Sequence, residues 1–166
     1  MSIFYMKQKA FSFKDKYKVL DAAQNQLYHC AGHFFSITRK KELYESKTNK
    51  HLYTLKRKLL SFLPKYELSD PEGSVVATIR KKIALLKHKI DISSSMGDFV
   101  IEGDFSAHNF AVLENGKEIV TVHKKWVSWG DSYEITISDD TKIPFFLGLV
   151  VMIDDCLHSR KNRNRI

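Results

Sequence analysis

Residues 125–133 read Lys-Trp-Val-Ser-Trp-Gly-Asp-Ser-Tyr, and the frame Lys-x-x-Ser-aromatic-x-Asp-x-Tyr recurs without a gap at residues 9–17. The match belongs to a fifteen-residue pattern that occurs four times, beginning at Tyr5, Thr54, Thr78 and Thr121. Every copy has an apolar second residue, then a basic cluster, and an aromatic or β-branched thirteenth residue. This recurrence indicates a fold built from repeated β-rich units.

The four copies fall into two halves, residues 5–69 and 74–138. The segments that separate the copies within each half, 28–34 and 99–105, also match, aromatic to aromatic and glycine to glycine. Repeats this long and this few do not form a solenoid, which stacks several short units. Because duplicated halves can pair edge to edge and leave no exposed edge, the pattern predicts a closed, pseudo-symmetric sheet.

Local signals along the chain agree with a mainly β fold. Short runs rich in aromatic and β-branched residues predict strands at 17–20, 99–102, 110–113, 119–122 and 133–137. Between two of these runs, Asn115-Gly116 is a strong hairpin signal. No series of strands alternates with long amphipathic helices, which argues against a parallel α/β sheet.

One segment departs from the strand pattern. Residues 143–153 read Ile-Pro-Phe-Phe-Leu-Gly-Leu-Val-Val-Met-Ile and are apolar on every side, so a helix here must be buried all round. Pro144 suits the first turn of a helix. The run is about half of the ~20 residues needed to cross a bilayer, and two aspartates follow it. We therefore expect a central helix over about 143–158 that fills the lumen of a barrel.

The two aspartates that follow, Asp154 and Asp155, raise a question of charge. If the helix lies inside a barrel, at least one carboxylate is buried and needs a partner, because an unpaired buried charge is costly. An inward Lys or Arg could pair with it, or the pair could emerge at the mouth of the barrel. Because Ser159 and a basic tail follow at once, we expect the mouth.

Length and composition set the broad class. The 166 residues fit a single domain over 1–166, and 43% hydrophobic content supports a packed core. Cys30 and Cys156 are too few for a secreted disulfide framework, so we expect two buried thiols. The N-terminus has neither a leading basic stretch nor a long apolar run. We expect a monomer in the cytoplasm, with no transmembrane segment.

Motifs of catalysis, metal binding and cofactor binding are missing from the sequence. There is no glycine-rich phosphate loop and no Gly-x-Ser-x-Gly elbow. His29 and His33 are four residues apart, but His29 falls in an expected strand and Gly32 intervenes. His108, His123 and His158 have no Cys or His at the spacing of a metal site. The adjacent pairs Asp139-Asp140 and Asp154-Asp155 diverge on a helix or a strand, so neither pair can grip a substrate together. We expect no enzyme activity, no metal and no cofactor.

The formal net charge of +8 is the main indication of a partner. Basic clusters recur in the repeats, and a basic surface attracts anionic polymers and anionic lipid headgroups. The candidate ligand-binding residues are Lys56, Lys58, Arg80, Lys82, Lys124 and Lys125. The alternative is that these side chains only solvate strands and protect sheet edges.

Several segments carry a resemblance to a known family. Residues 7–17, 60–66 and 124–133 and the apolar stretch before Asp154 resemble, in this order, the short bacterial members of the LURP-one-related family. That family is grouped with the tubby C-terminal domains and the phospholipid scramblases. The resemblance implies a tubby-like barrel of about twelve antiparallel strands around a central hydrophobic helix. It transfers no site residue to this chain.

Charge and resemblance together lead to three functional hypotheses. The first is a non-enzymatic binding module for anionic phospholipid or a phosphoinositide-like headgroup at the inner membrane surface, since tubby domains bind phosphoinositides. The protein would then be cytoplasmic and peripheral at the membrane. The second is nucleic-acid binding by the same charge, and the third is a small-ligand, scaffold or regulatory role.

Overall fold

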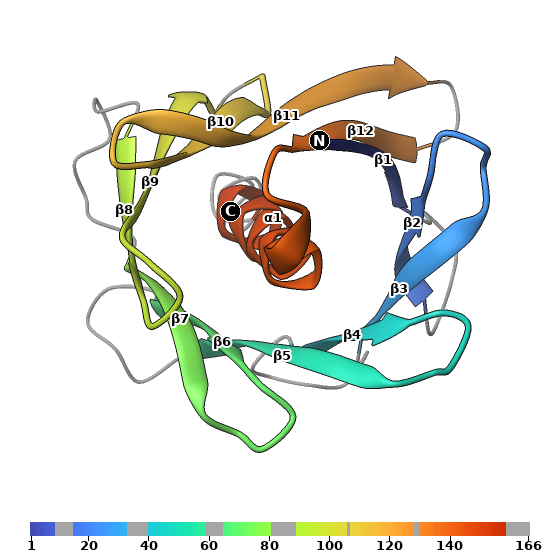
Figure 1. Ribbon diagram of the computed structural model, residues 1–166, viewed down its shortest axis with the longest axis horizontal. Helices are drawn as coiled ribbons and strands as arrows, with labels where there is room; N and C mark the ends of the chain where they lie inside the picture. The colour runs from blue at the N-terminus through green and yellow to red at the C-terminus, as the bar shows by residue number, and fades with distance from the viewer. Residues whose placement is uncertain are drawn as a thin grey trace, which may run out of the picture.

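The computed structural model describes residues 1–8, 15–32, 40–58, 65–80, 89–105, 107–127 and 130–158. These residues form a closed antiparallel barrel of twelve strands, β1–β12, with one helix, α1, running through its centre (Figure 1). The expected fold, a mainly β closed barrel around a C-terminal hydrophobic helix, is confirmed.

The strands are short and follow one another along the chain. Their bounds are β1 Ser2–Gln8, β2 Asp15–Leu20, β3 Gln26–Gly32, β4 Lys41–Glu45, β5 His51–Lys58, β6 Lys65–Ser69, β7 Val75–Arg80, β8 Lys89–Ser94, β9 Phe99–Asp104, β10 Asn109–Glu114, β11 Lys117–Val127 and β12 Gly130–Ile137. A 3₁₀ turn, η1 Asp140–Lys142, precedes α1 Ile143–His158.

The barrel has a simple up-and-down order. Each strand pairs antiparallel with the next along the chain, and β1 pairs with β12 to close the sheet. Closure leaves no unpaired strand edge. The expected Asn-Gly hairpin joins β10 to β11, with φ of 52° at Asn115 and 79° at Gly116. Both residue types tolerate the left-handed region that this tight turn requires.

Each repeat copy forms one hairpin, namely β1–β2, β5–β6, β7–β8 and β11–β12. The second position of the copies points inward and is buried in all four, at Met6, Leu55, Ile79 and Val122. The thirteenth position also lies on the inner face, at Tyr17, Tyr66, Ile90 and Tyr133. The ninth position lies outside the described residues in every copy. The repeat therefore encodes which strand positions face the core.

Helix α1 fills the interior of this barrel. Its side chains from Phe145 to Ile153 are at most 1% exposed, and each large apolar one that is fully buried contributes about 1.5–3 kcal/mol. Gly148 lies against β6, where a Cβ atom would come within 3.1 Å of Leu68 Cδ1. Before the helix, the Asp139 side chain accepts a hydrogen bond from the backbone N–H of Thr141. This cap fixes where the chain turns into the barrel.

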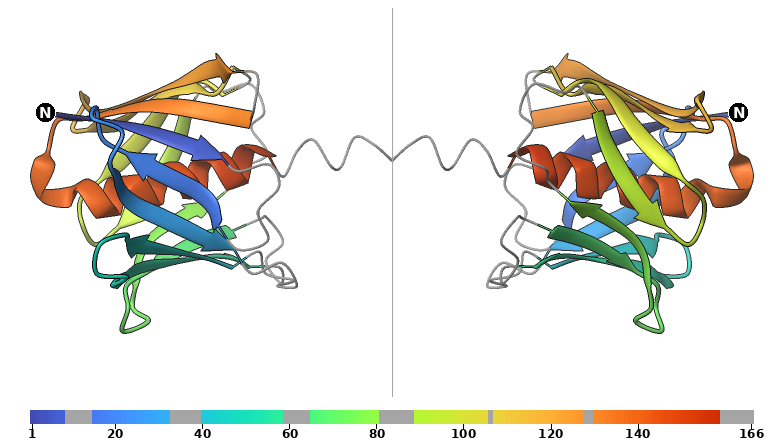
Figure 2. Two further views of the ribbon diagram at one scale, coloured as in Figure 1. Left: turned by 90° about the vertical axis from the view of Figure 1, so that its right-hand side faces the viewer. Right: turned by 90° about the vertical axis from the view of Figure 1, so that its left-hand side faces the viewer.

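The two ends of the barrel are distinct. The helix begins beside the N-terminus of the chain and runs along the barrel to the opposite end (Figure 2). The turns between β2 and β3, β4 and β5, β6 and β7, β8 and β9, and β10 and β11 lie at the end where α1 begins. We call this end the acidic end, after the carboxylates at its turns, and we call the end where α1 finishes the basic end, after the lysines and arginines of its strands.

Candidate functional site

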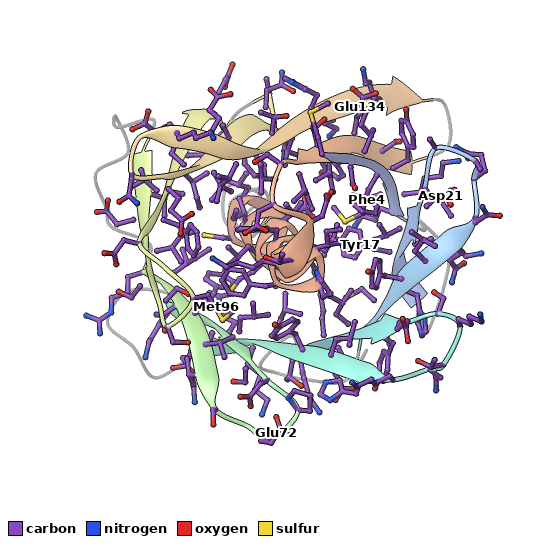
Figure 3. All side chains as sticks on the ribbon, viewed as in Figure 1. Phe4, Tyr17, Asp21, Glu72, Met96 and Glu134 are labelled. Atoms are coloured by element: carbon purple, nitrogen blue, oxygen red, sulfur yellow. The ribbon has the colours of Figure 1, made fainter. Side chains whose placement is uncertain are left out.

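Charged side chains of both signs lie at both ends of the barrel, and carboxylates outnumber the lysines (Lys47, Lys50, Lys117 and Lys142) at the acidic end. The carboxylates of the acidic end are Asp21, Glu45, Asp70, Glu72, Asp98, Glu114, Glu118, Asp139 and Asp140. Glu72 lies at the tip of the turn between β6 and β7 (Figure 3). The strand residues that approach the basic end include Lys7, Lys41, Lys56, Arg57, Lys58, Lys65, Arg80, Lys124 and Lys125. Carboxylates such as Glu42, Glu67, Glu102 and Asp104 approach the same end, so the arrangement of the cations on each face decides where an anionic partner is attracted.

Inside the basic end, a buried carboxylate holds the last turns of α1. Asp154 is 2% exposed. The Tyr17 hydroxyl donates a hydrogen bond of 2.5 Å to its Oδ2, and the Tyr133 hydroxyl donates one of 2.6 Å to its Oδ1. His108 Nδ1 lies 3.8 Å from Oδ1. Asp154 is thus held by two phenols, and the expectation that it emerges at the mouth is wrong.

The two tyrosines come from equivalent positions of the repeat. Tyr17 and Tyr133 are both at position thirteen, in β2 and β12, which lie on either side of β1. Tyr17 lies on the inner side of the wall, between β2 and α1 (Figure 3). Its pKa is raised well above the ordinary value, first by burial and then by the charge of Asp154 and the hydrogen bond to it. Both phenols therefore act as neutral donors to one carboxylate.

Asp155, the next residue, has a different partner. Lys41 Nζ lies 3.0 Å from Asp155 Oδ1, and the two side chains are 12% and 15% exposed. The same ammonium lies 5.0 Å from the centre of the Tyr17 ring, within the range of a cation–π contact. An inward lysine thus pairs with one of the two aspartates. Pairing with an inward Lys or Arg was one of the two alternatives that the sequence left open.

On the outer face of the basic end, cations form a row across three neighbouring strands. Lys58 of β5 lies opposite Lys65 of β6, and Lys65 lies opposite Arg80 of β7. Like charges directly opposite one another in a sheet are destabilising. Lys56, one outward position back along β5, is also exposed. We call Lys56, Lys58, Lys65 and Arg80 the outer cationic row.

One carboxylate partly neutralises this row. Glu67 Oε2 lies 3.2 Å from Lys58 Nζ, and its Oε1 lies 2.7 Å from Lys65 Nζ. Burial alone raises the pKa of Glu67, but the hydrogen bonds and charges of Lys65 and Lys58 outweigh it, so the pKa lies below its ordinary value. Neither Lys56 nor Arg80 has a side-chain hydrogen bond or ion pair within the described part of the chain. The row keeps a positive excess.

The six residues proposed from the sequence do not form one site. Lys56, Lys58 and Arg80 share the outer face of β5 and β7, whereas Lys82 lies outside the described residues. Lys124 and Lys125 belong to β11, on the opposite side of the barrel (Figure 1). Lys125 faces outward with Glu134 at 3.4 Å, and Lys124 is half-buried on the alternate, inner face. Of the six residues, only Lys56, Lys58 and Arg80 lie on one continuous part of the outer face.

Sequence reasoning missed Lys65, Arg57 and the partners of Asp154. The signal for the tyrosine pair was present, because Tyr17 and Tyr133 recur at one repeat position. Lys65 and Arg57 required the strand register, which decides what lies opposite and what faces inward. The sequence did not indicate that His108 lies near Asp154, because a turn with φ of 55° at His108 places it there.

Among the described residues there is neither a cluster of metal ligands nor a helix that could cross a membrane. Within ranges 1–8, 15–32, 40–58, 65–80, 89–105, 107–127 and 130–158, no group of three or more His, Cys, Asp or Glu side chains could hold a metal ion. In the same ranges, no helix has the length and apolarity that a membrane crossing demands.

Comparison with known proteins gives consistent matches. The family model described as LURP-one-related matches residues 2–154. The uncharacterised protein YxjI of Bacillus subtilis (strain 168) is 31% identical over 160 residues, which cover 96% of each chain. An X-ray structure of a protein from Arabidopsis thaliana superposes with a TM-score of 0.63 at 16% identity, covering 93% of this chain and 91% of the other. At that identity the likeness shows the fold alone. The chain belongs to the LURP-one-related family.

Proposed function

We propose that the protein is a non-enzymatic binding module that takes anionic phospholipid headgroups on its outer cationic row. The observation that carries the proposal is the alignment of Lys58, Lys65 and Arg80 across three strands. Such a row costs folding free energy through repulsion, and a bound anionic surface relieves that repulsion. The membrane-bound protein would be peripheral, with its basic end toward the lipid.

The excess of carboxylates over lysines at the acidic end supports the same orientation. An anionic membrane attracts the basic end and repels the carboxylates of the acidic end, such as Glu72 and Asp98. Each Lys or Arg near an anionic membrane surface contributes about 1 kcal/mol to binding. Four cations with one carboxylate among them therefore suffice for reversible attachment.

Sedimentation with liposomes tests the proposal. The double variant Lys56→Gln, Arg80→Gln removes the two cations of the row whose side chains have no partner within the described ranges, so folding should be unaffected. Losing two charges should weaken binding to anionic vesicles about 30-fold, from about 2 kcal/mol. The matched control is Lys47→Gln, Lys117→Gln, which removes two exposed lysines at the acidic end. This control should bind as the natural protein does.

Two results would reject the lipid proposal. Natural protein that binds anionic and neutral vesicles equally has no electrostatic lipid site. Tighter binding to DNA or RNA than to anionic vesicles, with a steep and unselective salt dependence, would instead favour the nucleic-acid alternative. Thermal unfolding of each variant shows whether a loss of binding is a loss of folding.

A further inference from the structure

The basic triplet at the end of β5 presents one cation to the interior of the barrel. Lys56 and Lys58 are exposed, whereas Arg57 between them is half-buried. Leu55, two residues before Arg57, is a core residue, and strand alternation places both on the same face. Across the sheet, Arg57 lies opposite Tyr66, which is 2% exposed and also inward. Arg57 therefore belongs to the inner face of the basic end.

The guanidinium of Arg57 has no partner in the part of the chain that the structure describes. Its Nε is buried and makes no hydrogen bond, and no other hydrogen bond or ion pair of this side chain occurs among residues that the structure describes. The inner carboxylates of α1 are engaged elsewhere, Asp154 by two tyrosines and Asp155 by Lys41. A buried polar atom left unsatisfied is uncommon, and a bound ion or water is a usual explanation.

A second inward cation lies on the neighbouring strand. Lys41 of β4 is opposite Leu55, so it is offset by two residues from Arg57 on the same face. Asp155 balances Lys41, and no carboxylate balances Arg57 in the described ranges. Arg57 thus faces the interior without a carboxylate paired to it in those ranges. The planar fork of an arginine matches the two oxygens of a phosphate or carboxylate group.

We propose that Arg57 anchors an oxyanion site on the inner face of the basic end, which takes a phosphate group. Strand alternation separates this site from the outer cationic row, because Arg57 and its two lysine neighbours point to opposite faces of β5. The site therefore goes beyond the proposed attachment to lipid and does not depend on it. The phosphate comes either from a free anion or from a headgroup.

Thermal unfolding in the presence of inorganic phosphate tests the site. A ligand that binds only the folded state raises Tm in a saturable way. At ten times its Kd, phosphate should raise Tm by about 3–6 °C relative to chloride at equal ionic strength. Arg57→Gln should weaken the apparent Kd at least ~10-fold, since it removes a charge-assisted hydrogen bond. Lys117→Gln, which removes one charge at the acidic end, should leave the shift unchanged.

Further arms separate the source of the phosphate and guard against a folding defect. Inorganic phosphate binding more tightly than glycerol phosphate assigns a free anion, and the reverse order assigns a headgroup. Arg57→Lys keeps the charge without the fork, so it should fold as the natural protein does and bind more weakly. The proposal is overturned if neither inorganic phosphate nor glycerol phosphate raises Tm in a saturable way. A shift that persists in Arg57→Gln, or one that is lost instead in Lys58→Gln, also overturns it.

Discussion

The inner and outer faces of the barrel wall differ at the basic end in how far water reaches their charged groups. On the inner face, Asp154 is 2% exposed and accepts hydrogen bonds of 2.5 and 2.6 Å. On the outer face, the side chain of Lys58 is 54% exposed and meets Glu67 at 3.2 Å. Water and salt screen the outer pair, whereas the inner network is protected from both.

Charged residues therefore have different roles on the two faces of the barrel wall. Inside, a charged group must be satisfied, because an unpartnered one costs far more than an exposed one. Outside, a cation can stay unpaired at little cost and is available to a partner. The inner network around Asp154 should therefore control stability, and changes on the outer face should affect stability little. The following substitutions test that division, from the largest expected effect to the smallest.

A carboxylate placed in the core should have the largest effect. Leu149 of α1 is 0% exposed, so Leu149→Asp puts a charge into the hydrophobic core and also leaves a cavity. We expect the free energy of unfolding to fall by at least about 4 kcal/mol, measured by urea denaturation. The matched control is Leu27→Asp, since Leu27 is 36% exposed on β3. Equal losses in the two variants would refute burial as the cause.

Removing one hydroxyl from the inner network should have an intermediate effect. Tyr17→Phe or Tyr133→Phe deprives the Asp154 carboxylate of one donor, which should cost about 1–3 kcal/mol each. Because both bonds end on one carboxylate, the double variant should show non-additive losses in a double-mutant cycle. Tyr44→Phe is the control, because the Tyr44 hydroxyl donates a hydrogen bond of 3.0 Å to Glu42 in a part-buried position. A loss in the control as large as the inner ones would contradict the comparison.

The raised pKa of Tyr17 gives this network a distinct dependence on pH. Its folded-state pKa is above the unfolded value of about 10, so its contribution is fully present below pH 10. The contribution disappears as pH rises through the folded pKa, because Tyr17 must then ionise beside Asp154. Stability measured from pH 9 upward should fall, and the fall should be shallower in Tyr17→Phe. An identical slope in that variant would show that Tyr17 does not titrate as described.

The smallest effect is expected on the outer face. Glu67→Gln weakens the contacts with Lys58 and Lys65 and should change stability at pH 7 by at most about 1 kcal/mol. Since the pKa of Glu67 is lowered by folding, its contribution is present above the unfolded pKa near 4.3 and is lost as pH falls through the folded pKa. The difference in stability between the natural protein and the variant, measured by denaturation, should therefore be smaller at pH 3 than at pH 7. A larger difference at pH 3 than at pH 7 would contradict this assignment.

Much of the fold follows from periodicity in the sequence. The recurrence of one β-rich pattern predicted a closed, pseudo-symmetric sheet, and its apolar second position, as at Met6 and Val122, is buried in all four copies. The all-round apolarity of 143–153 indicated a helix that must be enclosed. These inferences succeeded because a hydrophobic residue needs burial wherever it occurs, so its pattern alone carries structural information.

The candidate sites depended on information of another kind. The sequence showed Lys56-Arg57-Lys58 as one basic cluster, but strand alternation divides it between the two faces of β5. It also grouped Lys124 and Lys125 with Arg80, although β11 and β7 lie on different sides of the barrel. A charge is tolerated in many surroundings, so residue type by itself did not show which charges would meet.

The sequence by itself determined a closed β-barrel with repeated hairpins and a central helix, because hydrophobic periodicity acts locally and is readable along the chain. Tertiary structure alone decided the contacts between distant residues. Only barrel closure brings Tyr17 and Tyr133 to Asp154, and only strand register aligns Lys58, Lys65 and Arg80. The physical reason is that hydrogen bonds and ion pairs depend on distances of a few ångströms, which the folded chain sets and the order of residues does not.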